Sequence, residues 1–361
     1  MSLWKQFRKE VSAGLVGKNY GIPYSHEKLN LFTRTHAHEY RLYFALSGVG
    51  KSSLVYDVHL YNNMLLTRPG SKTQGISNIK VFNLFYNLEI RNENVAALLV
   101  AKWLYDNKRV IVDVPYLFGR NDATDKLDAI IQGHLKNDNE CKDFIDYVSD
   151  NTAIFTRATK DKIVQDIESL YANSYIIDES GQKKILPVAA KGETVIVQVI
   201  IDHIGLVTQA KGETAYEVVK GLSTELFRLR NKFPLAPIVI QQVTQEKMNF
   251  KGKDRTIPDI EGLYGSKTTF QDSDVAICIG SPLKAGFAEY LDYKVKYTEE
   301  HPENALMDRL RIIYIQKNRG GTIGNPIACL FLGEFGRFAY IDHPEQFNYT
   351  TLNNFKRYKK Q

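Results

Sequence analysis

The chain has 361 residues, 43% of them hydrophobic and 24% charged, which is enough to bury a sizeable core in one large domain or two smaller ones. No apolar run approaches the roughly 18 residues of a membrane span and no signal peptide is visible, so we expect a cytoplasmic protein without membrane contact. The net charge of +6 is compatible with a polyanionic partner but too small to demonstrate one, and the three cysteines have neither metal-ligand nor disulfide spacing.

Short apolar runs rich in β-branched residues alternate with amphipathic stretches along the chain. This alternation is typical of an α/β protein whose mostly parallel sheet is flanked by helices. Residues 1–40 are too few for a separate domain of usual size, and we treat them as a lead-in segment. Strands buried on both faces are predicted at 41–46, 79–86, 194–201, 237–242 and 274–279, with a closing pair at 311–316 and 326–332.

Helices are predicted between the strands, where apolar residues recur at helical spacing. The clearest lie at 52–64, 92–105 and 214–232. Residues 121–191 fit the alternation less well, because they are polar, helical in pattern at 123–135 and 160–172, and end in a turn at 178–181. We interpret them as a mainly helical insertion within a core domain of residues 41–345, and residues 346–361 as a basic C-terminal tail.

Residues 45–53 read Ala-Leu-Ser-Gly-Val-Gly-Lys-Ser-Ser, directly after a predicted strand and directly before a predicted helix. Glycines in this position let backbone N–H groups face phosphate oxygens, and the helix N-terminus adds positive charge. Lys51 would reach the terminal phosphates and the Ser52 hydroxyl would hold magnesium. The pattern departs from a phosphate-binding loop at one place, where Ala45 replaces glycine. The sequence therefore predicts a site for ATP and Mg²⁺ lined by Ser47, Gly48, Val49, Gly50, Lys51, Ser52 and Ser53.

An ATPase of this kind needs one carboxylate near the magnesium and another to orient the attacking water. The apolar runs 110–113 and 195–202 both end in aspartate, and we favour Asp202 over Asp113 because its run is longer. As the catalytic base we favour Glu89, which follows the strand after the phosphate-binding helix, at the edge where α/β sheets place their ligands. The alternative for Glu89 is a solvated residue at a helix start.

Five further segments occur in the order seen in DnaB-like replicative helicases, and the resemblance is to divergent phage members, over residues 21–338. These segments are Leu88-Glu89-Ile90, Ile201-Asp202-His203-Ile204, Gln241-Gln242-Val243-Thr244-Gln245, Phe270-Gln271-Asp272-Ser273-Asp274 and Lys317-Asn318-Arg319-Gly320-Gly321. The resemblance implies a RecA-like core and a hexameric ring that hydrolyses ATP at subunit boundaries. It also implies that Gln242 senses the γ-phosphate and that Lys317 and Arg319 reach into a neighbouring subunit's ATP site. On the residues alone, Lys317 and Arg319 also fit a basic turn between two strands.

The expected activity is that of an ATP-dependent helicase on single-stranded DNA, with a primase or a helicase loader as a further partner. Cations would grip the DNA phosphates. Two loops supply them, 208–214 and the more basic 247–267, although a solvated surface loop is the alternative for both. The candidate DNA-binding residues are Lys211, Lys247, Lys251, Lys253, Arg255 and Lys267. Competing functions are a RecA-like recombination or loading ATPase that forms filaments, and a nucleotide-binding structural or adaptor protein.

Overall fold

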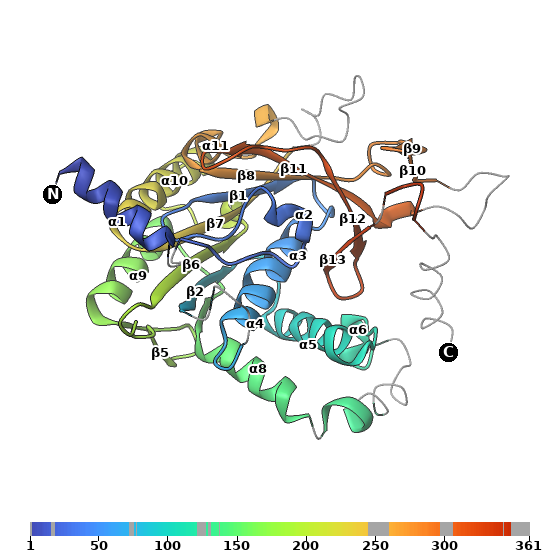
Figure 1. Cartoon of the computed structure of the whole chain (residues 1–361), viewed down its shortest axis with the longest axis horizontal. Helices are drawn as coiled ribbons and strands as arrows, with labels where there is room; N and C mark the ends of the chain where they lie inside the picture. The colour runs from blue at the N-terminus through green and yellow to red at the C-terminus, as the bar shows by residue number, and fades with distance from the viewer. Residues whose placement is uncertain are drawn as a thin grey trace.

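A computed structural model of the chain describes residues 2–15, 19–71, 76, 78–120, 128, 131–136, 138–244, 260–296, 306–341 and 343–347. Its centre is a nine-stranded sheet in the order β13-β12-β11-β8-β1-β7-β6-β2-β3 (Figure 1). The six strands from β8 to β3 run parallel, and β11, β12 and β13 extend the sheet antiparallel. The strands are β1 (Arg41–Ala45), β2 (Ile79–Asn87), β3 (Thr152–Phe155), β6 (Thr194–Asp202), β7 (Leu235–Gln242), β8 (Val275–Gly280), β11 (Leu310–Asn318), β12 (Ile327–Leu332) and β13 (Arg337–Tyr340).

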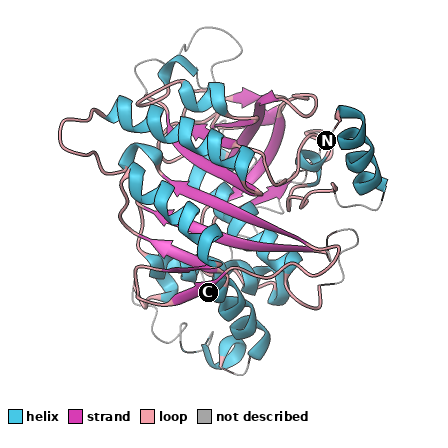
Figure 2. Cartoon of the chain, turned by 90° about the vertical axis from the view of Figure 1, so that its left-hand side faces the viewer, coloured by secondary structure: helices cyan, strands magenta, loops and turns pink. Residues whose placement is uncertain are grey.

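Helices cover both faces of this sheet (Figures 1 and 2). The longer helices of the described chain are α1 (Leu3–Leu15), α5 (Asn92–Lys108), α8 (Asn139–Asp150), α9 (Lys160–Asn173) and α10 (Ala215–Lys232), and all of these except α1 pack against the sheet. The shorter ones are α2 (Glu27–Asn30), α3 (Lys51–Val55), α4 (Asn63–Thr67), α6 (Val114–Leu117) and α11 (Thr268–Asp272), with 3₁₀ turns at Ile204–Leu206, Ile260–Gly262 and Met307–Arg309 and a π-helical turn at Ile131–Leu135. Two small hairpins, β4 (Tyr175–Ile177) with β5 (Lys183–Ile185) and β9 (Glu289–Tyr290) with β10 (Tyr293–Lys294), lie outside the sheet.

Each central strand contributes side chains to two hydrophobic cores, one on each face of the sheet, because successive side chains of a strand point to opposite faces. Leu42 and Phe44 of β1 belong to the core under α9 and α10. Tyr43 and Ala45 belong to the core under α3, α5 and α8, where Trp103 is among the largest fully buried side chains. The continuous apolar strands are thus buried on both faces, as their composition predicts.

The helix predicted at 52–64 is present as three consecutive pieces. It begins as α3, widens into a π-helical segment, η1 (Tyr56–Asn62), and ends as α4. The η1 segment carries polar residues that are buried and hydrogen-bonded. His59 Nδ1 lies 3.1 Å from Gln198 Oε1 on β6, and Asn63 Nδ2 donates to the same oxygen at 2.8 Å. These bonds join the helix after residues 45–50, the predicted phosphate-binding loop, to the middle of the sheet.

All seven predicted strands are present, and the α/β class with a mostly parallel sheet is confirmed. One part of the stretch 121–191 differs from the insertion that the sequence analysis expects. β3 pairs in parallel with β2 and forms the edge of the central sheet, so this strand belongs to the core. Its four residues are too short a run to be recognised as a strand. Most of the predicted helix 123–135 and of the tail 346–361 lies outside the described residues.

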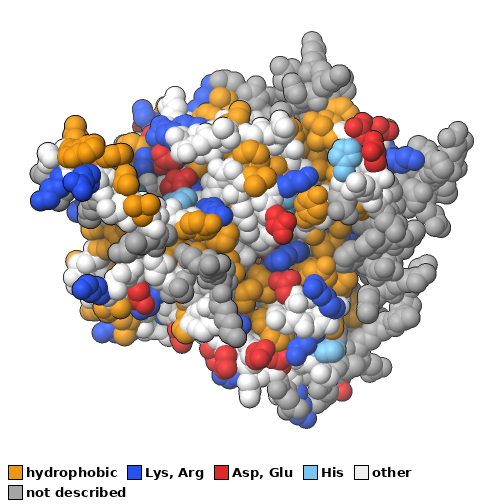
Figure 3. Space-filling view, viewed as in Figure 1, with side chains coloured by type: hydrophobic (Ala, Val, Ile, Leu, Met, Phe, Trp, Pro, Cys, Tyr) orange, Lys and Arg blue, Asp and Glu red, His pale blue; other side chains and the backbone are white. Residues whose placement is uncertain are grey.

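Helix α1 stands apart from the layers around the sheet (Figures 1 and 2). Its apolar side chains face solvent: Leu3 is 84% exposed and Trp4 is 66% exposed. They gather at the upper left of the face seen in Figure 3. Among the described residues, no helix has the length and apolarity to cross a bilayer.

Candidate active site

The loop between β1 and α3 has the conformation that its glycines allow. Gly48 and Gly50 have φ angles of +66° and +106°, in the left-handed region that favours glycine. A Cβ atom at Gly50 would also lie 3.1 Å from the ring of Phe338 and 3.2 Å from that of Phe331. Gly50 therefore meets two requirements, an unusual backbone angle and close contact with rings from β12 and β13. The loop ends where α3 begins, at Lys51.

Lys51 is buried beside the loop that it follows. Only 8% of its surface is exposed, and its Nζ donates to the carbonyl of Leu46 at 2.9 Å. Burial lowers the pKa of Lys51 to about 8, although Glu89 and Asp202 act in the opposite direction. A buried cation facing a single neutral carbonyl lacks a full counter-charge, so a phosphate group would stabilise its charged form.

Asp202 is the last residue of β6, and it lies at the carboxyl ends of the parallel strands, where Lys51 also lies. This end of the strands is called the edge of the sheet that holds the site. Its side chain is fully buried, and Ser52 Oγ donates to Oδ1 at 3.0 Å while the Tyr56 hydroxyl donates to Oδ2. Burial, helped by the charge of Glu89, raises the pKa of Asp202 to about 6, although the two hydrogen bonds and the charge of Lys51 act in the opposite direction. The peptide bond that joins Asp202 to His203 is cis.

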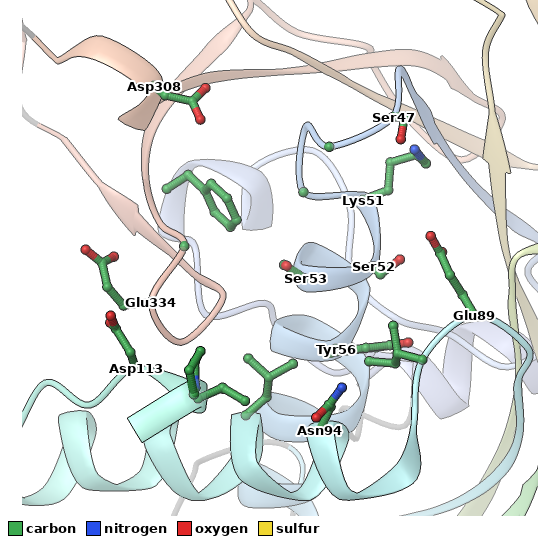
Figure 4. Close-up of a pocket in the computed structure, with 18 of the residues that line it drawn as sticks. Ser47, Lys51, Ser52, Ser53, Tyr56, Glu89, Asn94, Asp113, Asp308 and Glu334 are labelled. Atoms are coloured by element: carbon green, nitrogen blue, oxygen red, sulfur yellow. The ribbon is translucent and has the colours of Figure 1, made fainter. Parts of the chain in front are cut away.

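The pairing of neighbouring strands places Glu89 and Gln242 at this edge as well. Asn87 pairs with Asp202 across β2 and β6, so Glu89 lies just past the end of the strand beside it. Gln242 pairs with Ala45 across β7 and β1. Both side chains line a cavity of about 830 Å³, together with Lys51 and Ser52, and Figure 4 shows Glu89 pointing toward the part of the cavity where Lys51 lies.

The opposite wall of the cavity comes from segments that the sequence analysis did not single out. Asp308 and Arg309 from the 3₁₀ turn before β11 line it, with Glu334 from the turn between β12 and β13. Arg309 pairs with Glu334. Asp113, the alternative acid, also lines this wall (Figure 4), but it precedes α6 and no strand leads to it. Asp308, Arg309 and Glu334 belong to no recognisable sequence motif, so the sequence alone does not predict that they line the cavity.

Two cations hold the phosphate-binding loop from outside. Arg311 of β11 is fully buried and its Nε donates to the carbonyl of Val49 at 2.8 Å. Lys284, which follows β8, donates to the carbonyl of Ser47 at 2.9 Å. Both bonds use carbonyl groups of the loop, so they leave its N–H groups to a ligand.

The donors at the edge of the sheet fit a magnesium nucleotide. Magnesium prefers oxygen ligands and is usually held by one or two protein groups together with phosphates and waters. Ser52 and Asp202 supply such oxygens beside a buried lysine. Among the described residues, no group of three or more His, Cys, Asp or Glu side chains could hold a metal by protein ligands alone. The oxygens of Ser52 and Asp202 therefore fit a magnesium ion whose other ligands are phosphates and waters.

Lys317 and Arg319 lie at the other edge of the sheet. Asn318 pairs with Val275, and Val275 pairs with Arg41 at the start of β1, whereas the phosphate-binding loop follows the end of β1. The five residues of β1, at a rise of about 3.3 Å each, separate the amino end of this strand from the phosphate-binding loop at its carboxyl end by roughly 15 Å. Lys317 Nζ donates to the carbonyl of Phe270 at 2.7 Å, and Arg319 pairs with Asp274 at 3.2 Å. Within one chain, neither residue lines the cavity.

Two of the six candidate DNA-binding residues fall on described segments. Lys211 is exposed on the turn before α10, and Lys267 is exposed directly before α11. The other four, Lys247, Lys251, Lys253 and Arg255, lie outside the described residues. The described stems of the segment that contains them are attached to β7: Tyr264 N donates to the carbonyl of Gln242 at 2.9 Å, and Thr244 N to that of Gly262 at 2.9 Å.

The fold is similar to solved ATPase domains of replicative helicases. One such ATPase domain, solved on its own, matches with a TM-score of 0.60 at 17% sequence identity, covering 94% of this chain and 97% of that one. A DnaB-like replicative helicase, solved for its interactions with primase, matches with a TM-score of 0.57 at 15% identity, covering 95% of this chain and 67% of that one. No protein-family model and no curated protein sequence matches the chain. The chain thus shares the RecA-like fold of these helicase ATPase domains, as the sequence resemblance implies.

Proposed function

We propose that the chain is an ATP-hydrolysing, DnaB-like translocase or helicase that acts on single-stranded DNA as a homo-oligomeric ring. The observation that carries the proposal is the meeting of Lys51, Ser52, Glu89 and Asp202 at one edge of a sheet with a replicative-helicase fold. Phosphoryl transfer depends mostly on positioning and on charge stabilisation, and these four groups supply both.

Each residue has one role in this proposal. Lys51 binds the terminal phosphates, and Ser52 and Asp202 hold the magnesium, which neutralises phosphate charge when bound. Glu89 orients the attacking water from the exit of β2. Gln242 faces the γ-phosphate, and its backbone carbonyl, bonded to Tyr264 N, connects the site to the segment that carries most of the candidate DNA-binding lysines.

The assembly part of the proposal rests on what one chain cannot do alone. Developing charge on the transferred phosphoryl group is best stabilised by an additional cation. Lys317 and Arg319 are the candidates, and they lie at the far edge of the sheet from the site. We infer that they act in a neighbouring copy. The exposed apolar side of α1 supports assembly as well, because such surface is usually covered in the functional state.

The decisive experiment measures ATP turnover by the full chain with and without single-stranded DNA. We expect magnesium-dependent hydrolysis that rises when DNA is added, and its loss in Lys51→Ala. Binding of ATP without any hydrolysis would favour an adaptor protein, and helical filaments on DNA in electron micrographs would favour a recombination or loading factor. Either result would overturn the proposal.

A further inference from the structure

The carboxylate of Asp202 is held from two sides by residues of one continuous helical stretch. Ser52, in the first turn of α3, donates to Oδ1 at 3.0 Å. Tyr56, the first residue of η1, donates its hydroxyl proton to Oδ2. Because Asp202 is fully buried, each oxygen needs a donor from the protein in the absence of other ligands. The two bonds fix the rotation of the carboxylate about its Cβ–Cγ bond.

Tyr56 is itself firmly placed. Its side chain is 1% exposed, and its ring meets that of Phe85 on β2 edge-on, with centroids 5.5 Å apart and planes at 77°. Tyr56 is one of the residues that line the cavity, and Figure 4 shows it below Ser52. A ring clamped between the helix and β2 can hold one hydrogen-bond direction with little loss of side-chain entropy.

We propose that Tyr56 is a positioning residue for magnesium: its hydroxyl holds Oδ2 of Asp202 so that Oδ1, on the Ser52 side, faces the metal. This inference rests on the proposed function, because it needs a nucleotide-bound metal at Ser52 and Asp202. Tyr56 touches neither metal nor nucleotide in this role and acts through Asp202. Hydrogen bonds to metal-ligating carboxylates commonly set metal affinity in this way.

The role follows from how magnesium binds. The ion demands near-ideal octahedral geometry, keeps several waters, and takes few protein ligands. Because Asp202 is the one carboxylate assigned here to hold the metal, the site depends on the direction in which that carboxylate points. Replacing Tyr56 by phenylalanine leaves Oδ2 buried without its donor and lets the carboxylate rotate, while the ring packing against Phe85 remains.

The test is a titration with magnesium chloride of Tyr56→Phe and wild type, read by the fluorescence of a labelled ADP. Tyr43→Phe is the matched control, because its hydroxyl is equally buried but bonds to His59 Nε2 at 2.8 Å, away from Asp202. We expect the magnesium concentration for half-maximal binding to rise about tenfold in Tyr56→Phe. Tyr43→Phe should stay close to wild type, as should the binding of nucleotide to both variants in EDTA.

The outcomes separate the inference from the proposed function. If wild type binds nucleotide with magnesium and Tyr56→Phe has the same magnesium requirement, the positioning role fails while the proposed function stands. If wild type binds no nucleotide at any magnesium concentration, the proposed function fails first. A Tyr56→Phe protein that loses its cooperative unfolding transition in EDTA would also overturn the inference, because the role assigned here concerns the metal and not the fold.

Discussion

Lys51 and Asp202 are residues whose burial works against their own charge. Burial lowers the pKa of Lys51 to about 8 and raises that of Asp202 to about 6, so each charged form is less stable in the free protein than in water. Shifts of this kind are concentrated at functional sites, where they leave a charge ready to be matched by a ligand. A bound magnesium nucleotide would supply the missing counter-charges to both residues.

Asp202→Asn should therefore make the free protein more stable at neutral pH. The folded pKa of about 6 lies above the ordinary value of 3.8, so the folded state binds more protons between these values and wild type loses stability as pH rises through them. The difference corresponds to at most about 3 kcal/mol. Urea denaturation in EDTA should give the variant a larger free energy of unfolding at pH 7.5, and the gain should shrink towards pH 4. A gain that does not depend on pH would contradict this explanation.

Gly50→Ala should disable the phosphate-binding loop. The substitution places a side chain at a φ of +106°, which costs about 1–2 kcal/mol, and brings it against the rings of Phe331 and Phe338. Gly70→Ala is the control, because its φ of +80° carries a similar cost while its Cβ would meet open space. Thermal unfolding should shift in both variants, and labelled nucleotide binding should be lost in Gly50→Ala alone.

The residues of the site differ in how far the sequence predicts them. The motif at 45–53 names Lys51 and Ser52, and strand ends name Glu89 and Asp202, because the chemistry requires those residue types at those places. Tyr56, Lys284 and Arg311 could not be found in the same way. Their contacts depend on side-chain packing between segments more than 100 residues apart, for which one sequence holds no periodic signal.

At the level of elements, η1 is joined to its neighbours by buried charges. Asp57 of η1 accepts from Lys102 of α5 at 3.1 Å and from Arg337 of β13 at 3.0 Å, and all three side chains are largely buried. Burial would raise the pKa of Asp57, but Arg337 and Lys102 outweigh it and lower that pKa. Lys102 Nζ also donates to the carbonyl of Gly336 at 2.6 Å. The helix after the phosphate-binding loop is thus attached to both α5 and the last strand of the sheet.

Lys102→Met should cost about 3 kcal/mol of stability, because it leaves Asp57 with one cation instead of two in a buried site. Adding Asp57→Asn to this variant should recover part of the loss, since the unmatched charge is then gone. Urea denaturation of the two single variants and the double variant gives the coupling between the residues. Strictly additive losses would show that the pair does not interact.

Gln241, near the end of β7, is hydrogen-bonded to the segment that begins at Ile260. Gln241 is fully buried, and its Nε2 donates to the carbonyls of Tyr264 at 2.6 Å and Ser266 at 3.0 Å. Gln241→Leu removes these bonds while leaving Gln242 in place. We expect faster amide hydrogen exchange over residues 260–272 and a weaker response of ATP turnover to DNA, with nucleotide binding retained. Unchanged exchange would exclude Gln241 as the attachment of this segment.

The elements themselves were largely predictable. Long apolar strands and amphipathic helices have a clear period, and each of the seven predicted strands lies within a few residues of its observed place. β3 was not predicted because it is short and lies between polar helices. β13 was not predicted because its four residues show only a weak alternation of apolar and polar side chains. The π-helical geometry of η1 could not be foreseen, since its sequence reads as an ordinary amphipathic helix.

For the whole molecule, we predict that turnover depends on contact between copies, because Lys317 and Arg319 lie apart from the cavity. Lys51→Ala and Arg319→Ala should each be inactive alone. Mixed in equal amounts they should regain turnover, because random head-to-tail contacts make about one interface in four competent. Arg228→Ala is the control, since Arg228 is an exposed arginine on α10 that pairs with Glu225. Mixed assemblies that form but stay inactive would contradict action between copies.

The hydrogen bonds from Lys284 and Arg311 to the predicted phosphate-binding loop join segments that the ribosome makes at different times. The motif at 45–53 leaves the ribosome before the donors to the carbonyls of Ser47 and Val49, which are synthesised more than 200 residues later. A nascent chain would therefore carry the whole motif through the synthesis of more than 200 further residues without the side chains that shape it. Nucleotide capture should begin only after Arg311 has been synthesised and β11 has paired with β8.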